Sequence, residues 1–221
     1  MHLRRRQPEG LSPMHLLSSI LVLVLLKFGS GLKYRNVRAV DVKPVSELCA
    51  ETFEGPFEWH QVLKRQKCER EYEVQFGERL ISMVDAGLKH GMLMAETDTG
   101  SPVAFVELGM LPCPVVEKVD INGVEMEMRP DVMFLGNLAV KADHRRQGIA
   151  SKLLRVAEKL AEKWSERAIY VAVDAGNAPA LQMYSKLGFE VILDERGLIN
   201  ARGRGRGSEY RIFLRKALAE S

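Results

Sequence analysis

A strand, a short basic turn and a helix follow one another without a break between residues 132 and 164. The apolar run Val132–Val140 predicts a strand, and apolar residues at helical spacing predict an amphipathic helix over Gly148–Trp164. The turn between them contains Asp143-His144-Arg145-Arg146-Gln147-Gly148-Ile149-Ala150. This order restricts the fold, because the helix has to bury its apolar face on the sheet to which the strand belongs.

The turn has the composition of an anion-binding site. The first N–H groups of a helix lack partners within the helix, and the helix dipole places partial positive charge there. Gly148 allows the backbone to come close to a ligand, Ala150 is small, and Arg145 and Arg146 add positive charge. We expect a diphosphate at this place. Neither a Walker A sequence nor the three-glycine dinucleotide pattern is present, which excludes those two kinds of phosphate loop. The alternative is a helix that simply starts after a polar loop with exposed arginines.

The rest of the chain alternates between helical and extended patterns. Asn-Gly between two apolar runs predicts a small hairpin insert, and a Gly-containing turn predicts a second hairpin. Adjacent strands followed by strand–helix alternation predict an α/β (α+β) fold with one mixed sheet and helices on its faces. The expected strands are Tyr34–Val42, Met92–Glu96, Val103–Leu111, Val115–Val119, Val124–Met128, Ala168–Val173, Phe189–Leu193 and Glu209–Leu214, and the expected helices are Val45–Phe53, one or two within Glu58–His90, and Pro179–Leu187.

A second motif lies about thirty residues after the turn. Residues 177–189 contain Asn177, a short helical stretch with Tyr184, and then Gly188-Phe189. Together with Arg145, Gly148 and Ala150, this pattern resembles the GNAT superfamily of N-acetyltransferases, and within it the protein N-terminal and lysine acetyltransferases of the ribosomal and plastid kinds. The resemblance implies one acetyltransferase domain over residues 34–221. It further implies a mostly antiparallel sheet with helices on both faces, in which the fourth and fifth strands are parallel and splayed.

The resemblance also implies a site for acetyl-CoA, with no metal ion. In such a site the coenzyme arm lies along the fourth strand, a bulge near Gly136 opens the gap, and a backbone N–H near Leu138 polarises the thioester carbonyl. Tyr184 occupies the position of the general acid. The residues expected to bind the coenzyme are Leu138, Ala139, Val140, Arg145, Arg146, Gln147, Gly148, Ile149, Ala150, Ser151 and Asn177.

The acceptor is less well defined. A protein or peptide amine is expected, either an N-terminal α-amine or a lysine ε-amine. Because an α-amine is far less basic than a lysine, α-amines should react at least as readily as lysines. Candidate general bases are Glu107, Glu125, Glu127 and Asp174, each of which is otherwise a solvated surface acid. The alternatives are acetylation of a small-molecule amine and a coenzyme-binding module without catalysis.

The N-terminal residues 1–33 form a separate extension in this interpretation. Arg4-Arg5-Arg6 precedes the apolar run Leu16–Leu26, a layout typical of a signal-like targeting segment. A retained hydrophobic anchor or a start at a later methionine are the alternatives, so contact with a membrane is expected only through this segment. Three cysteines without a metal or disulfide pattern favour a reducing compartment. A plastid would reconcile the two features, and the cytoplasm is the alternative location.

The charge distribution argues against nucleic acid as a partner. The first 43 residues contain eight Lys and Arg against two acidic residues, so the whole-chain charge of +3 leaves the other 178 residues at −3. An Arg-Gly tract at residues 202–207 is either a basic loop near the acceptor entrance, which steers acidic substrates or touches ribosomal or nucleic-acid surfaces, or a solvated loop. The sequence as a whole does not distinguish a monomer from a dimer.

Overall fold

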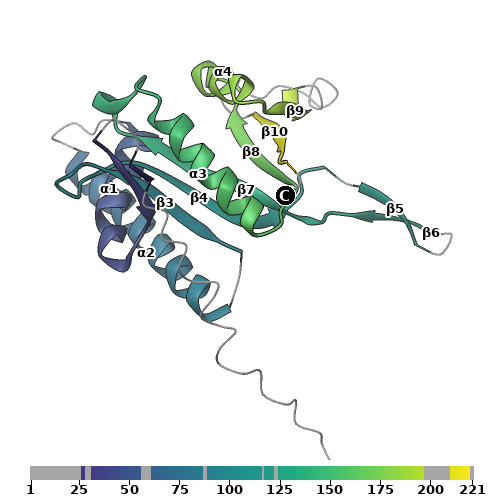
Figure 1. Cartoon of the computed structure of the whole chain (residues 1–221), viewed down its shortest axis with the longest axis horizontal. Coiled ribbons are helices and arrows are strands. Elements are labelled where there is room, and N and C mark those ends of the chain that lie inside the picture. The colour runs from purple at the N-terminus through teal and green to yellow at the C-terminus, as the bar shows by residue number, and fades with distance from the viewer. Residues whose placement is uncertain are drawn as a thin grey trace, which may run out of the picture.

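The computed structural model describes residues 26–27, 31–55, 61–86, 89–115, 117–121, 124–196 and 210–219. Within these ranges, an eight-stranded sheet has the order β1-β2-β3-β4-β7-β8-β10-β9. Figure 1 shows α3 lying across one face of this sheet, whereas α1 and α2 lie at the other. The sheet strands are β1 (Leu26–Lys27), β2 (Lys33–Asn36), β3 (Gly91–Glu96), β4 (Pro102–Pro112), β7 (Asp131–Val140), β8 (Ala168–Asp174), β9 (Glu190–Asp194) and β10 (Arg211–Ala217), and the α-helices are α1 (Val42–Glu54), α2 (Val62–Ala86), α3 (Ile149–Lys163) and α4 (Ala178–Lys186).

The expected mixed, mostly antiparallel sheet is confirmed. Among the described strands only β7 and β8 pair in parallel, and all other pairs are antiparallel. The predicted hairpin insert is also present as β5 (Glu117–Ile121) and β6 (Val124–Met128). These two strands form a sheet of their own, which projects away from the main body in Figure 1.

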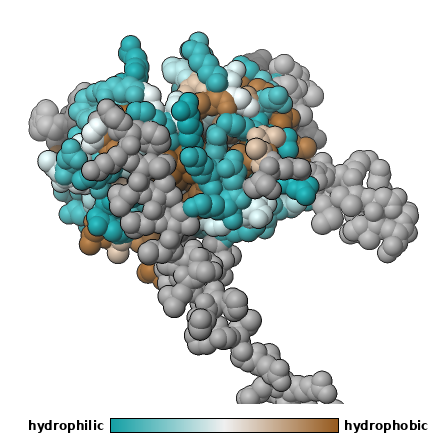
Figure 2. Space-filling view, in the orientation of Figure 1, coloured by the Kyte–Doolittle hydropathy of each residue, from teal (hydrophilic) through white to brown (hydrophobic). Residues whose placement is uncertain are grey.

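Apolar side chains form one cluster on each face of the main sheet within the described part of the chain. Leu153, Leu154 and Leu160 of α3 pack against β3, β4 and β7 on one face. Val45 and Leu48 of α1 pack with Phe76 of α2 on the other. The outward residues of α3, such as Arg155, Lys159 and Lys163, are exposed, and Figure 2 shows a largely hydrophilic surface on this side. The predicted amphipathic helix is therefore confirmed.

The first predicted strand is wrong in its second half. Strand β2 ends at Asn36, and a 3-10 turn at Ala39–Asp41 leads directly into α1. The turn forms because the Asp41 carboxylate accepts hydrogen bonds from the backbone N–H and the guanidinium of Arg38. A side-chain contact of this kind competes with the strand ladder for the backbone.

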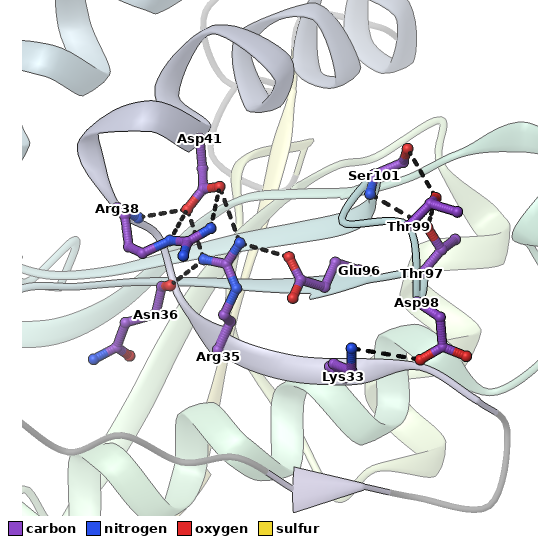
Figure 3. A network of polar contacts seen from close by, with 10 residues as sticks. All are labelled: Lys33, Arg35, Asn36, Arg38, Asp41, Glu96, Thr97, Asp98, Thr99 and Ser101. Atoms are coloured by element: carbon purple, nitrogen blue, oxygen red, sulfur yellow. Dashed lines mark hydrogen bonds and ion pairs between the residues drawn. The ribbon is translucent and has the colours of Figure 1, made fainter.

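A buried ion cluster connects this turn to the sheet (Figure 3). The guanidinium of Arg35 donates to both carboxylate oxygens of Asp41, at 2.6 and 2.9 Å, and to Glu96 at 2.5 Å. All three residues are less than 9% exposed. Removal of one member would leave the others as buried charges without a partner, which is costly, so the three residues depend on one another.

Gly91, at the start of β3, allows α3 to lie close to the sheet. A Cβ atom here would stand 2.8 Å from Leu160 Cδ2 and 3.0 Å from the Trp164 ring. We expect Gly91→Val to lower the free energy of unfolding by about 1–3 kcal/mol, because the helix has to move away. Urea unfolding followed by tryptophan fluorescence measures this. Gly77→Ala in α2 is the control, since a Cβ there meets nothing within 4 Å, and it should not destabilise the protein. Equal stability of Gly91→Val and wild type would contradict the expected close packing.

Several predictions concern residues outside the described ranges. These are the basic residues and most of the apolar run of the N-terminal extension, and the Arg-Gly tract at 202–207. The boundary at residue 33 stays a prediction. No helix in the described ranges is long and apolar enough to cross a membrane.

Candidate functional site

The start of α3 has the geometry of an anion-binding site. Gly148 is the N-cap residue and, because it has no side chain, it accepts no hydrogen bond from the N–H groups of the first turn in the way that Ser, Asp or Asn would. The first helical hydrogen bond runs from the N–H of Lys152 to the carbonyl of Gly148, at 3.1 Å. The N–H groups of Ile149, Ala150 and Ser151 therefore have no acceptor inside the helix. Such groups, aligned with the helix dipole, favour a phosphate oxygen.

The preceding turn is tight because two of its residues have a left-handed backbone. Arg146 has φ +60° and Gly148 has φ +74°. Side chains brace the turn from both sides, since Arg145 Nε donates to the Val140 carbonyl at 3.0 Å and Gln147 Nε2 donates to the Asp143 carbonyl at 3.2 Å. The structure thus brings the predicted residues 145–151 together in one turn, with Arg145, Arg146 and Gln147 exposed. Which of them contact phosphate stays a prediction.

Strands β7 and β8 separate along their length. Their parallel pairing joins Met133 to Ile169 and ends with Leu135 and Val171. Beyond that point β7 continues for five residues to Val140, and β8 for three residues to Asp174. The two strands therefore diverge toward the turn that leads into α3. Within the described residues, Gly136–Val140 therefore have no paired partner in β8, and their backbone groups on this side are the ones that an extended ligand anchored at α3 would reach.

A β-bulge in β7 lies where the gap begins. The pairing with β4 passes from Glu107–Gly136 to Phe105–Ala139, so Asn137 and Leu138 together oppose one residue of β4. Asn137 has φ +52°, a left-handed conformation that Asn tolerates better than most residues. The bulge is therefore one residue further along the chain than the predicted site at Gly136.

The extra residue reverses the faces of β7. Before the bulge, Met133 and Leu135 belong to the cluster on the α3 face. After it, Leu138 and Val140 pack on that face, and Ala139 belongs to the cluster beneath α1. The three residues expected to hold the coenzyme arm therefore form the edge of the gap. Their contact with a ligand stays a prediction.

Tyr184 and Asn177 lie in the segment that follows β8. Tyr184, on α4, is 4% exposed and packs edge-on against Phe189, with ring centroids 5.1 Å apart. Burial raises the pKa of Tyr184, so the hydroxyl keeps its proton at neutral pH. The side-chain oxygen of Asn177 accepts the Ala180 N–H at 3.2 Å and caps α4. Its Nδ2 amide is the group left to donate to a coenzyme.

The candidate bases differ in their surroundings. Asp174 is exposed, and its Oδ1 accepts the N–H of Gly176, which fixes the turn before α4. The side chains of Glu125 and Glu127 lie outside the described part of the structure. Glu107 is 6% exposed and contacts Arg79, His90 and Asn137. Within the described residues, no group of three or more His, Cys, Asp or Glu is placed to hold a metal ion.

Sequence reasoning missed those three partners of Glu107. Their separations from Glu107 are 28, 17 and 30 residues, and no local pattern indicates contacts at such a range. Sequence periodicity also gives no sign of a hollow of about 190 Å³ between the end of α1 and the turn before α3. Its lining includes Glu51, Thr52, Gly55, Lys141, Ala142 and Arg145.

Substitution of Gly148 tests the anion site directly. We expect Gly148→Val to weaken coenzyme A binding about 5- to 30-fold, because valine relaxes away from φ +74° in the free protein and binding has to restore this conformation at a cost of about 1–2 kcal/mol. Isothermal calorimetry with coenzyme A measures the change. Gly100→Val is the matched control, since Gly100 has φ +83° in the turn between β3 and β4. It should reduce stability and leave binding intact, and equal binding by both variants would argue against the site.

Sequence comparison identifies relatives of the chain. The model of the Acetyltransferase (GNAT) family matches residues 51–189. The chain is 35% identical over 78 residues to GCN5-related N-acetyltransferase 4, chloroplastic, of Arabidopsis thaliana, a match that covers 35% of this chain and 27% of that protein. The chain thus matches only about a quarter of the length of this relative. It is 26% identical to an N-alpha-acetyltransferase of Sulfurisphaera tokodaii over 167 residues, which are 75% of this chain and 84% of that protein.

Solved structures share the fold. The PaiA N-acetyltransferase of Thermoplasma acidophilum, in complex with coenzyme A, superimposes with a TM-score of 0.56 at 19% identity, over 84% of this chain and 98% of that chain. The ribosomal-protein-S18-alanine N-acetyltransferase of Escherichia coli gives 0.55 at 18% identity, over 86% and 96%. At these identities the likeness concerns the fold alone. Because the family model covers more than half of the sequence and these structures share its fold, the chain belongs to the GNAT family of acetyltransferases.

Proposed function

We propose that the protein transfers an acetyl group from acetyl-CoA directly to an amine of a protein or peptide, with N-terminal α-amines among its acceptors. The observation that carries the coenzyme is the bulged gap between β7 and β8, which leads to the uncapped start of α3. Acetyl-CoA matches both features, because its diphosphate suits the start of α3 and its long narrow arm suits the gap between β7 and β8. The match to an N-alpha-acetyltransferase over three quarters of the chain supports a protein acceptor.

The diphosphate is held at the start of α3 in this proposal. The N–H groups of Ile149, Ala150 and Ser151 bind its oxygens, and the exposed Arg145 and Arg146 add positive charge. The arm then runs along Leu138–Val140, and the Nδ2 amide of Asn177 donates to it from across the gap. This arrangement places the thioester near the bulge, at the point where β7 and β8 part.

The reaction is a direct displacement. The amine nitrogen attacks the thioester carbon, a C–N bond forms, and the C–S bond breaks. The N–H of Leu138 stabilises the oxyanion that develops on the carbonyl oxygen. The departing thiolate takes a proton from Tyr184, which burial keeps protonated. The amine loses its surplus proton to water or to a base, and Tyr184 regains a proton from solvent, so that the products are an amide and coenzyme A.

The acceptor preference follows from amine basicity. An α-amine, with a pKa of about 7.7–8.0, is substantially neutral near pH 7.5, whereas only about one lysine in a thousand is neutral there. A lysine acceptor would therefore need a strong base in the site. Glu107 is the described carboxylate nearest to the bulge along the paired strands, but it is already bonded to three side chains. This arrangement favours α-amines.

A peptide assay tests the proposal. Each peptide is supplied with a free α-amine and one internal lysine, and in a second form with the α-amine blocked. After incubation with acetyl-CoA, mass spectrometry locates the acetyl group. We expect the free peptides to be acetylated at the N-terminus, and Gly148→Val to show much less turnover at the same coenzyme concentration. Acetylation confined to lysine would contradict the α-amine preference. Turnover of a small amine in place of all peptides would contradict the protein acceptor.

We also propose a plastid location. Support comes from two Arabidopsis relatives named chloroplastic, which match only 78 and 59 residues of the chain. A fusion of the full chain to a fluorescent protein, imaged in leaf cells, tests the location. Fluorescence throughout the cytoplasm would contradict it.

A further inference from the structure

Glu107 is the buried centre of a polar cluster that joins four elements. It lies on β4, and its carboxylate accepts hydrogen bonds from Arg79 on α2 (2.6 Å) and from Asn137 on β7 (2.8 Å), both at Oε2. His90, in the loop before β3, contacts Oε1 at 2.7 Å. The cluster thus connects the bulge of β7 to the helix and the loop on one face of the sheet.

The carboxylate is ionised at neutral pH. Burial alone would raise the pKa of Glu107, but the hydrogen bond from His90 and the charge of Arg79 together lower it below its ordinary value. An ionised carboxylate only accepts hydrogen bonds. The Nε2 atom of His90 therefore carries a proton and donates a hydrogen bond to Oε1.

Asn137 needs this support because of its backbone. A residue with a side chain at φ +52° is held in a sparsely populated conformation. The amide of Asn137 points to Glu107 and not to solvent, so a fixed acceptor holds the strained residue from the neighbouring strand. The next residue, Leu138, carries the N–H that the proposed mechanism directs at the thioester.

We propose that Glu107 is a positioning residue for acetyl transfer, which holds Asn137 in the bulge of β7 and thereby sets the direction of the backbone at Leu138. This inference rests on the proposed function. It assigns Glu107 a role different from that of a general base. The carboxylate aligns the group that polarises the carbonyl and takes no proton from the amine.

The pattern of contacts separates the two roles. Both oxygens of Glu107 are engaged, and a lowered pKa makes the carboxylate a weaker base. A general base would also need a path to the acceptor amine, whereas the contact of Glu107 with Asn137 is direct. Hydrogen bonds to fixed partners are what a positioning residue requires, since small displacements of a reacting group cost up to about 100-fold in rate.

Three variants test the proposal. Glu107→Gln loses the negative charge and the basicity but keeps an oxygen that can accept from Asn137, while its amide can donate to the other tautomer of His90. Glu107→Ala removes the acceptor. Asn137→Gly removes the amide that the carboxylate holds, and because glycine adopts positive and negative φ about equally readily, nothing then fixes the bulge, although residue 107 is unchanged.

We expect kcat to fall about 10- to 100-fold in Glu107→Ala and in Asn137→Gly, and by less than about five-fold in Glu107→Gln. The dissociation constant of coenzyme A should rise by a smaller factor than kcat falls, because the diphosphate anchor at α3 is not changed in any of the three. The double variant Glu107→Ala/Asn137→Gly should be no slower than either single variant. A loss in Glu107→Gln as large as in Glu107→Ala, with full activity of Asn137→Gly, would show a general base and overturn the proposal.

Hydrogen exchange gives a second measurement that does not depend on turnover. The amides of residues 137–139 should exchange faster in Glu107→Ala and Asn137→Gly than in the wild type, and at the wild-type rate in Glu107→Gln. If the wild type acetylates no amine, the proposed function fails while this comparison still decides whether Glu107 holds the bulge. Unchanged exchange in Glu107→Ala would refute the positioning role. Circular dichroism first establishes that Glu107→Ala is folded, and only the folded protein is compared.

Discussion

Replacement of Arg35 by methionine should lower the free energy of unfolding by about 3–5 kcal/mol, because it leaves buried carboxylates without their cation. The hydrogen bonds to Asp41 and Glu96 tie the start of α1 to the end of β3 (Figure 3). Arg38 remains beside Asp41 but is largely exposed, so it replaces only part of the lost charge. Chemical denaturation at pH 7 measures the loss. Arg35→Lys is the control, and should lose less because it keeps the charge without the planar pair of donors.

The effect of Arg35→Met should depend on pH in a defined direction. Burial alone would raise the pKa of Asp41, but hydrogen bonds from Arg35 and Arg38 hold it well below its ordinary value. A lowered carboxyl pKa contributes stability above the unfolded-state pKa of about 4, and this contribution disappears as the pH falls below it. The wild type should therefore lose stability on acidification, whereas Arg35→Met is relieved as its buried Asp41 becomes protonated. The difference between the two should shrink below pH 4, and a constant difference from pH 7 to pH 3 would contradict the assignment.

Tyr184→Phe should reduce kcat about 100-fold or more, since general acid catalysis typically contributes about 10²–10⁴-fold. The ring is buried against Phe189, and phenylalanine keeps this packing while it removes the proton that the thiolate needs. The KM for acetyl-CoA and the thermal stability should change little. Steady-state kinetics with a free α-amine peptide measure both constants.

A control separates the hydroxyl from the ring. Phe189→Leu disturbs the same aromatic contact without removing a proton donor, so it should cost stability and leave kcat within a few-fold of the wild type. If Tyr184→Phe keeps the wild-type kcat, water or another group protonates the thiolate, and the role expected for Tyr184 is wrong. The slow step would then be product release or another event that the hydroxyl does not affect.

Much of the fold could be predicted because it depends on local pattern. The segment from β7 through α3 combines a continuous apolar run, a turn with glycine and a helical stripe of leucines, and each signal is contained within about fifteen residues. The same holds for the Asn-Gly hairpin, which the structure contains as β5 and β6. Chain order then places the anion site at the start of α3 without further information.

The parts that could not be predicted depend on contacts between distant residues. Strand β2 ends at Asn36 because Arg35 and Arg38 bind Asp41, and Glu96 completes that cluster from 61 residues away. The bulge falls at Asn137 and not at Gly136, although glycine adopts unusual conformations more easily. The amide contact to Glu107, 30 residues earlier, accompanies the left-handed conformation of Asn137, and periodicity carries no information about such a pair.

The bulge in β7 also divides the strand into two halves in which side chains alternate between the faces of the sheet in opposite order. Before it, odd-numbered residues such as Met133 and Leu135 face α3, and after it even-numbered residues such as Leu138 and Val140 do so. Deletion of one residue at 137 or 138 would remove the bulge and leave Ala139 and Val140 on their present faces. Loss of the bulge without a deletion would instead continue the alternation of the first half into the second. Ala139 would then exchange faces with its neighbours, although every side chain of β7 would still be present. When homologous strands are aligned or libraries are designed across residues 136–139, a one-residue gap therefore corresponds to loss of the bulge and not to an exchange of faces.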